Sequence, residues 1–240
     1  MAWLARAGSE VVLTARSEAK GQEAVDRILR QIPQAKVRFG LLDLASLDSV
    51  RAFAASMSHE AKLDLLVNNA GVMAIPERQV TKDGFEMQFS TNYLGPFALT
   101  LLLLPTLQRA VSPRVTTVSS GAANMGLKKI NFDDLQWEKS YGLWKAYCQS
   151  KLAGLMLMLE LERRCDAAGV RLLSNAAYPG YVRTNLQTSG PGREQNPIEK
   201  IIASFPKCSS LHSMHSAWQP LYSDSAGAGY PSRSRFSKRP

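Results

Sequence analysis

Short runs of β-branched and aliphatic residues alternate with longer amphipathic patterns along most of this 240-residue chain. The runs predict strands over 11–14, 37–42, 63–68, 114–119 and 170–175. The amphipathic patterns predict helices over 17–32, 47–57, 84–109 and 147–168, the third one broken near Gly95-Pro96. Strands that alternate with helices run parallel, which predicts an α/β fold with a doubly wound parallel sheet. Ligands of such sheets bind beyond the carboxyl ends of the strands, so the residues at those ends are the candidates for chemistry.

The composition narrows the class of protein. Hydrophobic residues make up 45% of the chain, which suits one domain with a sizeable core. The longest apolar stretch, 97–104, is far shorter than the roughly 20 residues that a membrane span needs. Three cysteines without metal-ligand spacing or a disulfide framework are typical of a reducing compartment. We therefore expect a cytoplasmic protein without an integral membrane segment or a metal site.

The C-terminal segment differs from the rest of the chain. From about Ser209 the sequence is rich in serine, and no strand or helix is predicted. The net charge of the whole chain is +9, and four basic residues near its end contribute to it: Arg233, Arg235, Lys238 and Arg239. A basic tail can bind nucleic acid, but no nucleic-acid module accompanies it, so a solvated tail is the preferred interpretation. The expected organisation is a folded domain over 1–208 and a disordered tail over 209–240.

Residues that follow the first three predicted strands suit a dinucleotide. Arg16 follows the first strand, where a guanidinium can form a bidentate pair with a 2′-phosphate, which favours NADP over NAD. Asp43 follows the second strand and either accepts a hydrogen bond from an adenine amino group or caps the helix that begins near Ser46. The third strand ends in Asn68-Asn69-Ala70-Gly71, whose small residues let the backbone approach a ligand closely.

Tyr147 and Lys151 lie four residues apart at the head of a long apolar helical pattern. One helical turn places both groups on the same face of the helix. An ammonium beside a phenol favours the phenolate, so Lys151 is expected to lower the pKa of Tyr147 toward that of an acid/base catalyst. Tyr141 and Lys145 have the same spacing. Tyr147 is preferred because its helix continues for several turns and can hold both side chains rigidly.

Further polar and turn residues stand where a substrate or nicotinamide would bind. Ser120 follows the fourth strand, where its hydroxyl can bind a substrate oxygen. Asn92 lies in the disturbed helix, where an exposed carbonyl can hold an ordered water. The turn after the fifth strand supplies four candidates for contact with the cofactor: Pro179, Gly180, Val182 and Thr184. Taken singly, each candidate also fits an ordinary turn, cap or surface position.

Taken together and in order, these motifs resemble the short-chain dehydrogenase/reductase family over roughly 1–207. The loop between Ser120 and Tyr147 is similar to that of the retinol-dehydrogenase-like and WW-domain-oxidoreductase-like branch, which tends to use NADP. The resemblance implies that Tyr147 is the general acid/base and that Lys151 lowers its pKa and binds the nicotinamide ribose. It also implies that Ser120 orients the substrate carbonyl and that Asn92 positions a water in a proton relay. Hydride would pass between the nicotinamide and a ketone, aldehyde or secondary alcohol.

The chain departs from the family pattern at both ends. The resemblance implies a first strand with a Thr-Gly-x-x-x-Gly-x-Gly turn, lying between the strands that end at Arg16 and Asn68, and neither is present in the sequence. Loss of that strand is expected to leave two unpaired strand edges or to force them together. Residues 209–240 also do not resemble the family's last strand. The alternative function is therefore a truncated, catalytically silent relative that acts at most as a binding or interaction protein, and self-association is left open.

Overall fold

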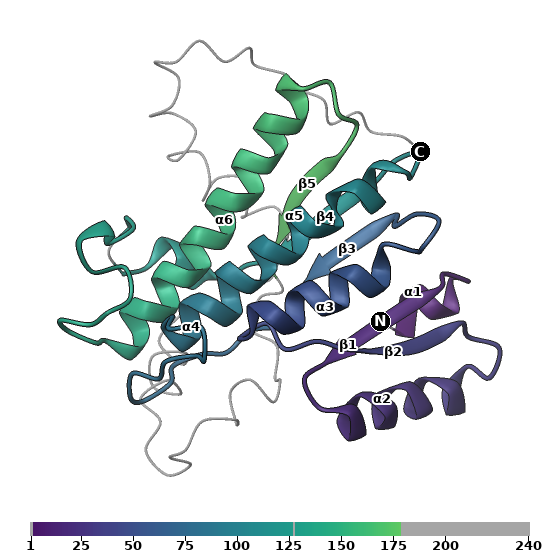
Figure 1. Cartoon of the computed structure of the whole chain (residues 1–240), viewed down its shortest axis with the longest axis horizontal. Helices are drawn as coiled ribbons and strands as arrows, with labels where there is room; N and C mark the ends of the chain where they lie inside the picture. The colour runs from purple at the N-terminus through teal and green to yellow at the C-terminus, as the bar shows by residue number, and fades with distance from the viewer. Residues whose placement is uncertain (1, 127, 179–240) are drawn as a thin grey trace, which may run out of the picture. The chain divides into compact units, whose positions relative to one another are not determined.

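The computed structural model describes residues 2–126 and 128–178 of the chain (Figure 1). Its helices are α1 Ala2–Arg6, α2 Glu18–Gln31, α3 Leu47–Met57, α4 Met87–Phe89, α5 Gly95–Gln108 and α6 Leu143–Ala167. Its strands are β1 Val11–Ala15, β2 Val37–Leu41, β3 Leu65–Asn68, β4 Arg114–Val118 and β5 Leu173–Ala177. The residues expected after the fifth strand (Pro179, Gly180, Val182 and Thr184) and the expected domain boundary near 208 lie outside the described residues.

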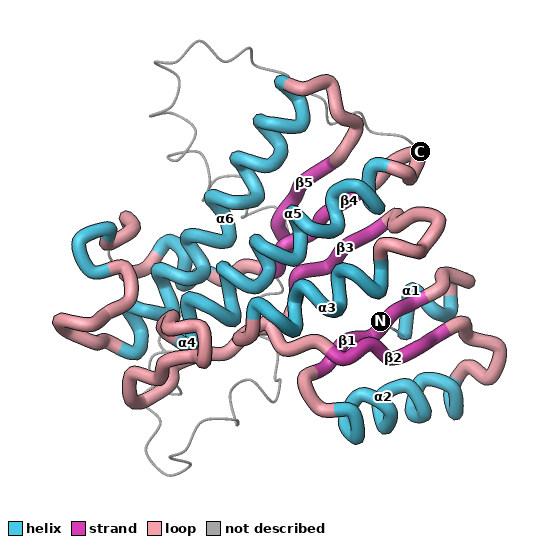
Figure 2. The backbone as a smooth tube through the Cα atoms, in the orientation of Figure 1, coloured by secondary structure: helices cyan, strands magenta, loops and turns pink. Residues whose placement is uncertain are grey.

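Two helices form where the sequence places them, because each has a clear start signal. The hydroxyl of Ser17 accepts a hydrogen bond from Lys20 N and caps α2, which ends before Pro33. The hydroxyl of Ser46 accepts one from Ser49 N and caps α3. Strands and helices alternate along the chain as the pattern predicts (Figure 2). The prediction of an α/β fold is confirmed.

The five strands form two parallel sheets. β1 pairs with β2, with Val11 opposite Val37. β4 lies between β3 and β5, with Asn68 opposite Thr117. In the described part of the chain, β1 and β3 are each paired on one side only. Of the two outcomes expected for a chain without the central strand, the structure therefore shows the unpaired edges.

The helices cover the sheets and enclose one shared apolar cluster. α5 packs on β3, α6 packs on β4 and β5, and α3 packs against α5 (Figure 1). Val50 of α3, Leu103 of α5 and Val115 of β4 are almost fully buried in this cluster. Leu42, just beyond β2, belongs to this cluster, and Val12 of β1 packs against it. Each buried aliphatic side chain contributes about 1.5–3 kcal/mol, so this cluster joins the two sheets although no strand pairing does.

The predicted break in the third helix is a π-helical segment, Ser90–Leu94, between α4 and α5. Pro96 stands in the first turn of α5, where its missing N–H costs no hydrogen bond. A Cβ on Gly95 would lie only 2.3 Å from Leu44 O, so glycine allows α5 to approach the loop after β2. π-helical turns are rare and are frequent at functional sites, which draws attention to Asn92 at the centre of this one.

The predicted first residues of α6 and β5 are wrong by three or four residues. α6 begins at Leu143 rather than near Tyr147, because Ala146 N already donates to Gly142 O. β5 begins at Leu173 rather than Val170, because Val170 N donates to Cys165 O and closes the turn after α6. None of the helices in the described residues is long and apolar enough to cross a membrane.

Candidate active site

The long helix α6 carries the predicted catalytic pair on its buried face. Tyr147 and Lys151 are both almost fully buried, and the Lys151 ammonium lies 5.8 Å from the centre of the Tyr147 ring. Lys151 Nζ donates a hydrogen bond to Val118 O at 3.2 Å. Val118 is the last residue of β4, so the pair lies at the carboxyl end of that strand.

Burial has the largest effect on the pKa of Tyr147 and on that of Lys151. Burial raises the pKa of Tyr147 above 10, while a hydrogen bond with Ser120 acts in the opposite direction and the neighbouring Cys148 and Tyr178 raise it further. Burial lowers the pKa of Lys151 to about 8. The expectation that Lys151 lowers the pKa of Tyr147 is therefore wrong for this structure, because the ammonium faces the ring and bonds to Val118 O.

Ser120 meets Tyr147, as the pattern of strand ends suggested. It follows β4 and begins a short 3₁₀ turn, Gly121–Asn124, where its hydroxyl accepts a hydrogen bond from Ala122 N at 3.2 Å. Its side chain also forms the hydrogen bond with Tyr147 that counters the burial of the phenol. The two hydroxyls together can bind one substrate oxygen at the end of β4.

Asn92 is a structural tie between the π-helical turn, the segment after β3 and α6. Its Oδ1 accepts from Val72 N at 2.8 Å, and its Nδ2 donates to Val72 O and to Ser150 Oγ, both at 2.9 Å. Ser150 Oγ in turn donates to Tyr147 O at 2.7 Å. The side chain of Asn92 is thus buried with both of its polar atoms engaged, and an ordered water at a carbonyl of this disturbed helix stays a prediction.

Apart from those on α6, the predicted cofactor residues that the structure describes lie at the carboxyl ends of three strands, β1, β2 and β3. Arg16 is exposed directly after β1, and Asn69 and Ala70 are exposed directly after β3. Gly71 lies beside the catalytic pair, because a Cβ there would be 2.8 Å from Asn92 Oδ1 and 3.5 Å from Lys151 Nζ. The structure therefore brings the end of β3 to Lys151.

Asp43 follows β2 and uses one carboxylate oxygen locally. Its Oδ1 accepts a hydrogen bond from Ala45 N at 2.9 Å, while Ser46 is the residue that caps α3. Of the two roles considered for Asp43, the cap is therefore wrong.

An apolar wall surrounds the Tyr147 phenol. Ala122, Tyr147 and Cys148 form a buried cluster, with Met73 and Trp144 packed against it. The Trp144 ring meets the Tyr147 ring edge to face, with 5.9 Å between their centres. The side chains that pack against Tyr147 are therefore mainly apolar or aromatic.

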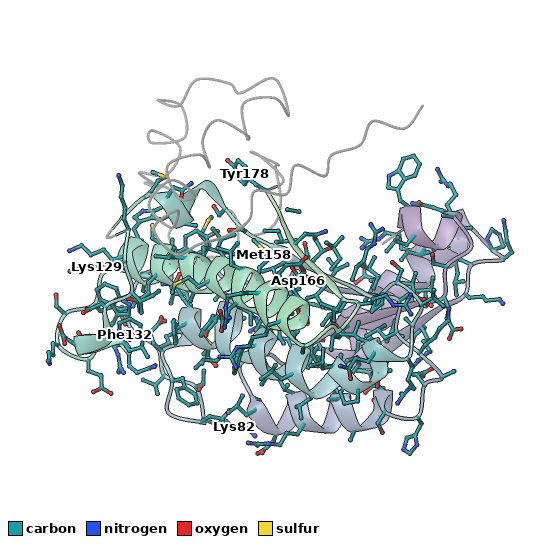
Figure 3. All side chains as sticks on the ribbon, turned by 90° about the horizontal axis from the view of Figure 1, so that it is seen from above. Lys82, Lys129, Phe132, Met158, Asp166 and Tyr178 are labelled. Carbon is teal, nitrogen blue, oxygen red and sulfur yellow. The ribbon has the colours of Figure 1, made fainter. Side chains whose placement is uncertain are left out.

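The segment between β4 and α6 borders the same end of α6. In Figure 3, Lys129 and Phe132 lie at the opposite end of α6 from Asp166, beside the half that carries Tyr147. The Gln149 side chain fixes this segment, because it accepts from Asn131 N and donates to Leu135 O.

Sequence reasoning missed a buried polar group near α6 that includes Glu86 and Gln88. Gln88 Nε2 donates to Tyr141 Oη and to Leu143 O, and Tyr141 Oη donates to Ile75 O. Burial and the nearby Glu86 raise the pKa of Tyr141 to about 12. Tyr141, the rival of Tyr147 on spacing, therefore has its hydroxyl engaged in holding a loop.

Comparison with known proteins agrees with this geometry. Residues 2–132 match the family model of the short chain dehydrogenases. Retinol dehydrogenase 13 of Homo sapiens is 44% identical over 185 residues, which cover 76% of this chain and 54% of that protein. Polyprenol dehydrogenase of Homo sapiens is 41% identical over 188 residues, which cover 76% of this chain and 56% of that protein. The chain spans about half the length of the curated relatives it matches.

Solved structures share the fold. An uncharacterised protein from Mycobacterium paratuberculosis has a TM-score of 0.67 at 46% identity, covering 78% of this chain and 65% of that chain. A short-chain dehydrogenase from Shigella flexneri, complexed with NADP, has a TM-score of 0.62 at 23% identity, covering 82% of this chain and 77% of that chain. The order of the motifs, the family model and these relatives agree: the chain belongs to the short-chain dehydrogenase/reductase family, in its retinol-dehydrogenase-like branch.

Proposed function

We propose that the chain is an NADP-dependent oxidoreductase that interconverts a carbonyl and an alcohol, with Tyr147 as the acid/base. One observation carries the proposal: the phenol of Tyr147, the hydroxyl of Ser120 and the ammonium of Lys151 meet at the carboxyl end of β4. Parallel α/β sheets bind their ligands at that edge. The retinol and polyprenol dehydrogenase relatives support an oxidoreductase.

The residues present fit a nicotinamide dinucleotide. Gly71 leaves no room for a side chain beside Lys151 and Asn92, so the backbone after β3 can approach a ligand closely. Lys151 would hold the nicotinamide ribose, and Arg16 would hold the 2′-phosphate. When bound, the nicotinamide supplies or accepts the hydride. Further contacts would come from Asp43, Asn69, Ala70, Pro179, Gly180, Val182 and Thr184.

Proton transfer falls to Tyr147. Because its pKa is raised above 10, the phenol is protonated at neutral pH and suits donation of a proton to the carbonyl oxygen of a substrate during reduction. Ser120 would orient that oxygen through its hydroxyl. The side chain of Asn92 would hold Ser150 and Val72 in place. The water of the proposed proton relay would then be bound by the main-chain carbonyl of Asn92.

The substrate proposed for this site is a lipophilic aldehyde, ketone or alcohol. The wall formed by Met73, Ala122, Trp144 and Cys148 around Tyr147 is apolar. Retinol and polyprenol dehydrogenases are among the relatives that the chain matches. An apolar wall stabilises a hydrocarbon substrate in proportion to the area that it buries.

The alternative, a catalytically silent relative, is favoured by one observation. β1 and β3 have no strand between them in the described part of the chain. The glycine-rich turn that supplies backbone amides to a pyrophosphate would follow such a strand. Calorimetric titration with NADPH separates the two functions, since the silent relative predicts no binding.

The proposal also includes a cytoplasmic location and self-association of the chain. A cytoplasmic location is supported by Cys148 and Cys165, which are free thiols. Self-association is supported by half-exposed apolar side chains on α5 and α6: Leu101, Leu102, Met156 and Leu159. Apolar side chains that gather on exposed helix faces mark possible contacts between copies, and sedimentation of the purified chain tests this.

The direct test is NADPH-dependent reduction of retinal. Tyr147→Phe should lower kcat by about 10²–10⁴-fold while leaving the NADPH affinity unchanged, because only the proton donor is removed. Tyr93→Phe is the matched control, since the Tyr93 ring packs at a tilt against Phe89 and Phe97 rather than against Tyr147, and this variant should retain full activity. Equal activity of Tyr147→Phe and the unmodified chain would contradict the proposal.

A further inference from the structure

Gln88 on α4 joins two parts of the candidate site through its buried amide. Its side chain is 0% exposed. Its Nε2 donates to Tyr141 Oη at 2.9 Å and to Leu143 O at 3.0 Å. In an α-helix each N–H bonds to the carbonyl four residues earlier, so Leu143 O also accepts from Tyr147 N. Gln88 therefore reaches α6 at the turn that carries the proposed acid/base.

Tyr141 extends this connection to the segment that follows β3. Its hydroxyl accepts from Gln88 and donates to Ile75 O at 2.8 Å. Ile75 lies a few residues beyond Gly71, which is next to Lys151. Because the pKa of Tyr141 is raised to about 12, its hydroxyl keeps its proton and remains a donor at neutral pH.

Glu86 fixes the position of Gln88. The two carboxylate oxygens of Glu86 accept from Gln88 N at 3.0 Å and from Phe89 N at 2.7 Å, and so cap α4. Glu86 N donates to Gln136 Oε1 at 2.7 Å, and Arg78 Nε donates to Gln136 O at 2.9 Å. The backbone of Gln88 is thus fixed by Glu86, and this fixes the point from which the Gln88 side chain extends.

Gln88 is not placed for stability alone. Its Oε1 is buried without a hydrogen-bond partner among the described residues. Leaving such an acceptor unpaired costs about 1–3 kcal/mol. The amide cannot be turned round, because Leu143 O only accepts and must face the nitrogen. With one buried oxygen left unpaired and both donated bonds directed to the candidate site, the Gln88 amide is arranged to fix the geometry of that site.

We propose that Gln88 is a positioning residue for Tyr147. Its amide holds the first turn of α6 against the segment after β3, and so sets where the phenol lies relative to Ser120. The inference rests on the proposed role of Tyr147 as acid/base. Without the amide, α6 keeps its helical bonds, but its first turn is no longer tied to Tyr141 and the segment that ends at Ile75.

Gln88→Leu is the test variant, because it keeps a similar volume and removes both the donors and the unpaired oxygen. It should fold with little loss of stability and lower kcat for retinal about tenfold, since small misplacements of a catalytic group are costly. Gln88→His keeps a ring N–H donor and should restore most of kcat. Gln108→Leu, at the exposed end of α5, is the matched control.

The second readout is the titration of Tyr147 itself, followed by NMR with ring-labelled tyrosine. Burial is the largest cause of its raised pKa, so a loosened first turn that admits water should lower that pKa in Gln88→Leu. The lost bond to Ser120 acts in the opposite direction but is the smaller cause. Lys151, Cys148 and Tyr178, which also face the phenol, are unchanged by the substitution.

The outcomes separate this inference from the proposed function. An unmodified chain without turnover would defeat the proposed function, and the titration would still decide the positioning role. A Tyr147 titration in Gln88→Leu identical to that of the unmodified chain would overturn that role. Should Gln88→Leu fail to fold, Tyr141→Phe breaks the same connection and should lower the pKa of Tyr147 in the same direction.

Discussion

Lys151 shows most clearly how burial changes the chemistry of a single side chain. It is 8% exposed and donates to the carbonyl of Val118. Burial lowers its pKa from 10.5 to about 8, since the ammonium has lost most of its water. The folded chain therefore binds this proton less tightly than the unfolded chain does, and the difference must appear in the pH dependence of stability.

Lys151 should make the chain more stable as the pH rises from about 8 to 10.5, because over this window the unfolded chain holds more protons on the lysine. Compared with Lys151→Met, the unmodified chain should gain about 3 kcal/mol of unfolding free energy across it. Urea unfolding of both proteins at several pH values measures the gain. Tyr147 and Cys148 change stability in the opposite direction but are present in both proteins. A difference that stays constant with pH would contradict this account.

Asn92 is expected to contribute strongly to stability, because it bonds to three groups at once: the part-buried Val72 N and Val72 O and the buried Ser150 Oγ. Asn92→Leu should cost about 3 kcal/mol of unfolding free energy, since those groups lose their partner. Asn92→Asp keeps the bond from Val72 N but has no donor, so its unfolding free energy should lie between those of the unmodified chain and Asn92→Leu. The exposed Asn124→Leu is the control in urea unfolding. A loss for Asn92→Leu no larger than the control's would show that the tie is not needed.

The site residues were only partly predictable from the sequence. The spacing of Tyr147 and Lys151 indicates a shared helical face, and the strand ends indicate where Ser120 lies. The direction of the Tyr147 pKa could not be read from spacing, because burial depends on what packs around α6. Gln88 gave no signal at all, since a glutamine in a helical run gains its role only from partners more than 50 residues away, such as Tyr141.

The helices and strands were predictable where short-range signals mark their ends. Ser17 and Ser46 are caps followed by amphipathic patterns, and α2 and α3 begin directly after them. α6 has no such signal, because its N-terminal cap is Gly142, which offers no side-chain hydrogen bond. The start of α6 was therefore placed too late. Its first turn is fixed from outside the helix, by Gln88.

Two helical glycines should respond to alanine in opposite ways. Gly95→Ala should destabilise the chain by about 1–3 kcal/mol, because its Cβ would lie 2.3 Å from the backbone oxygen of Leu44, which cannot move freely. Gly154→Ala in α6 would meet only Thr117 Cγ2 at 3.7 Å, an ordinary contact. It should stabilise α6 by about 0.5–1 kcal/mol. Thermal unfolding of both variants checks the signs, and a stabilising Gly95→Ala would disprove the close approach.

The molecule combines a family site with an interrupted sheet. β1 and β3 each keep one unpaired edge in the described residues, and the two sheets are joined through the apolar cluster that includes Val12 and Val115. The alternation pattern predicted parallel strands but not this division, because strand order depends on contacts between distant segments. The resemblance in the motifs placed a further strand between those ending at Arg16 and Asn68 and left two outcomes open, unpaired edges or edges forced together, of which the structure shows the first.

The central claim is that this chain transfers hydride with Tyr147 as the acid/base. It is tested most directly by incubating the purified chain with retinal and NADPH deuterated at C4, and measuring deuterium in the alcohol by mass spectrometry. The account predicts one deuterium per alcohol formed, with formation about 10²–10⁴-fold slower in Tyr147→Phe. No deuterated alcohol from the unmodified chain would contradict it, and would leave the catalytically silent relative as the better description.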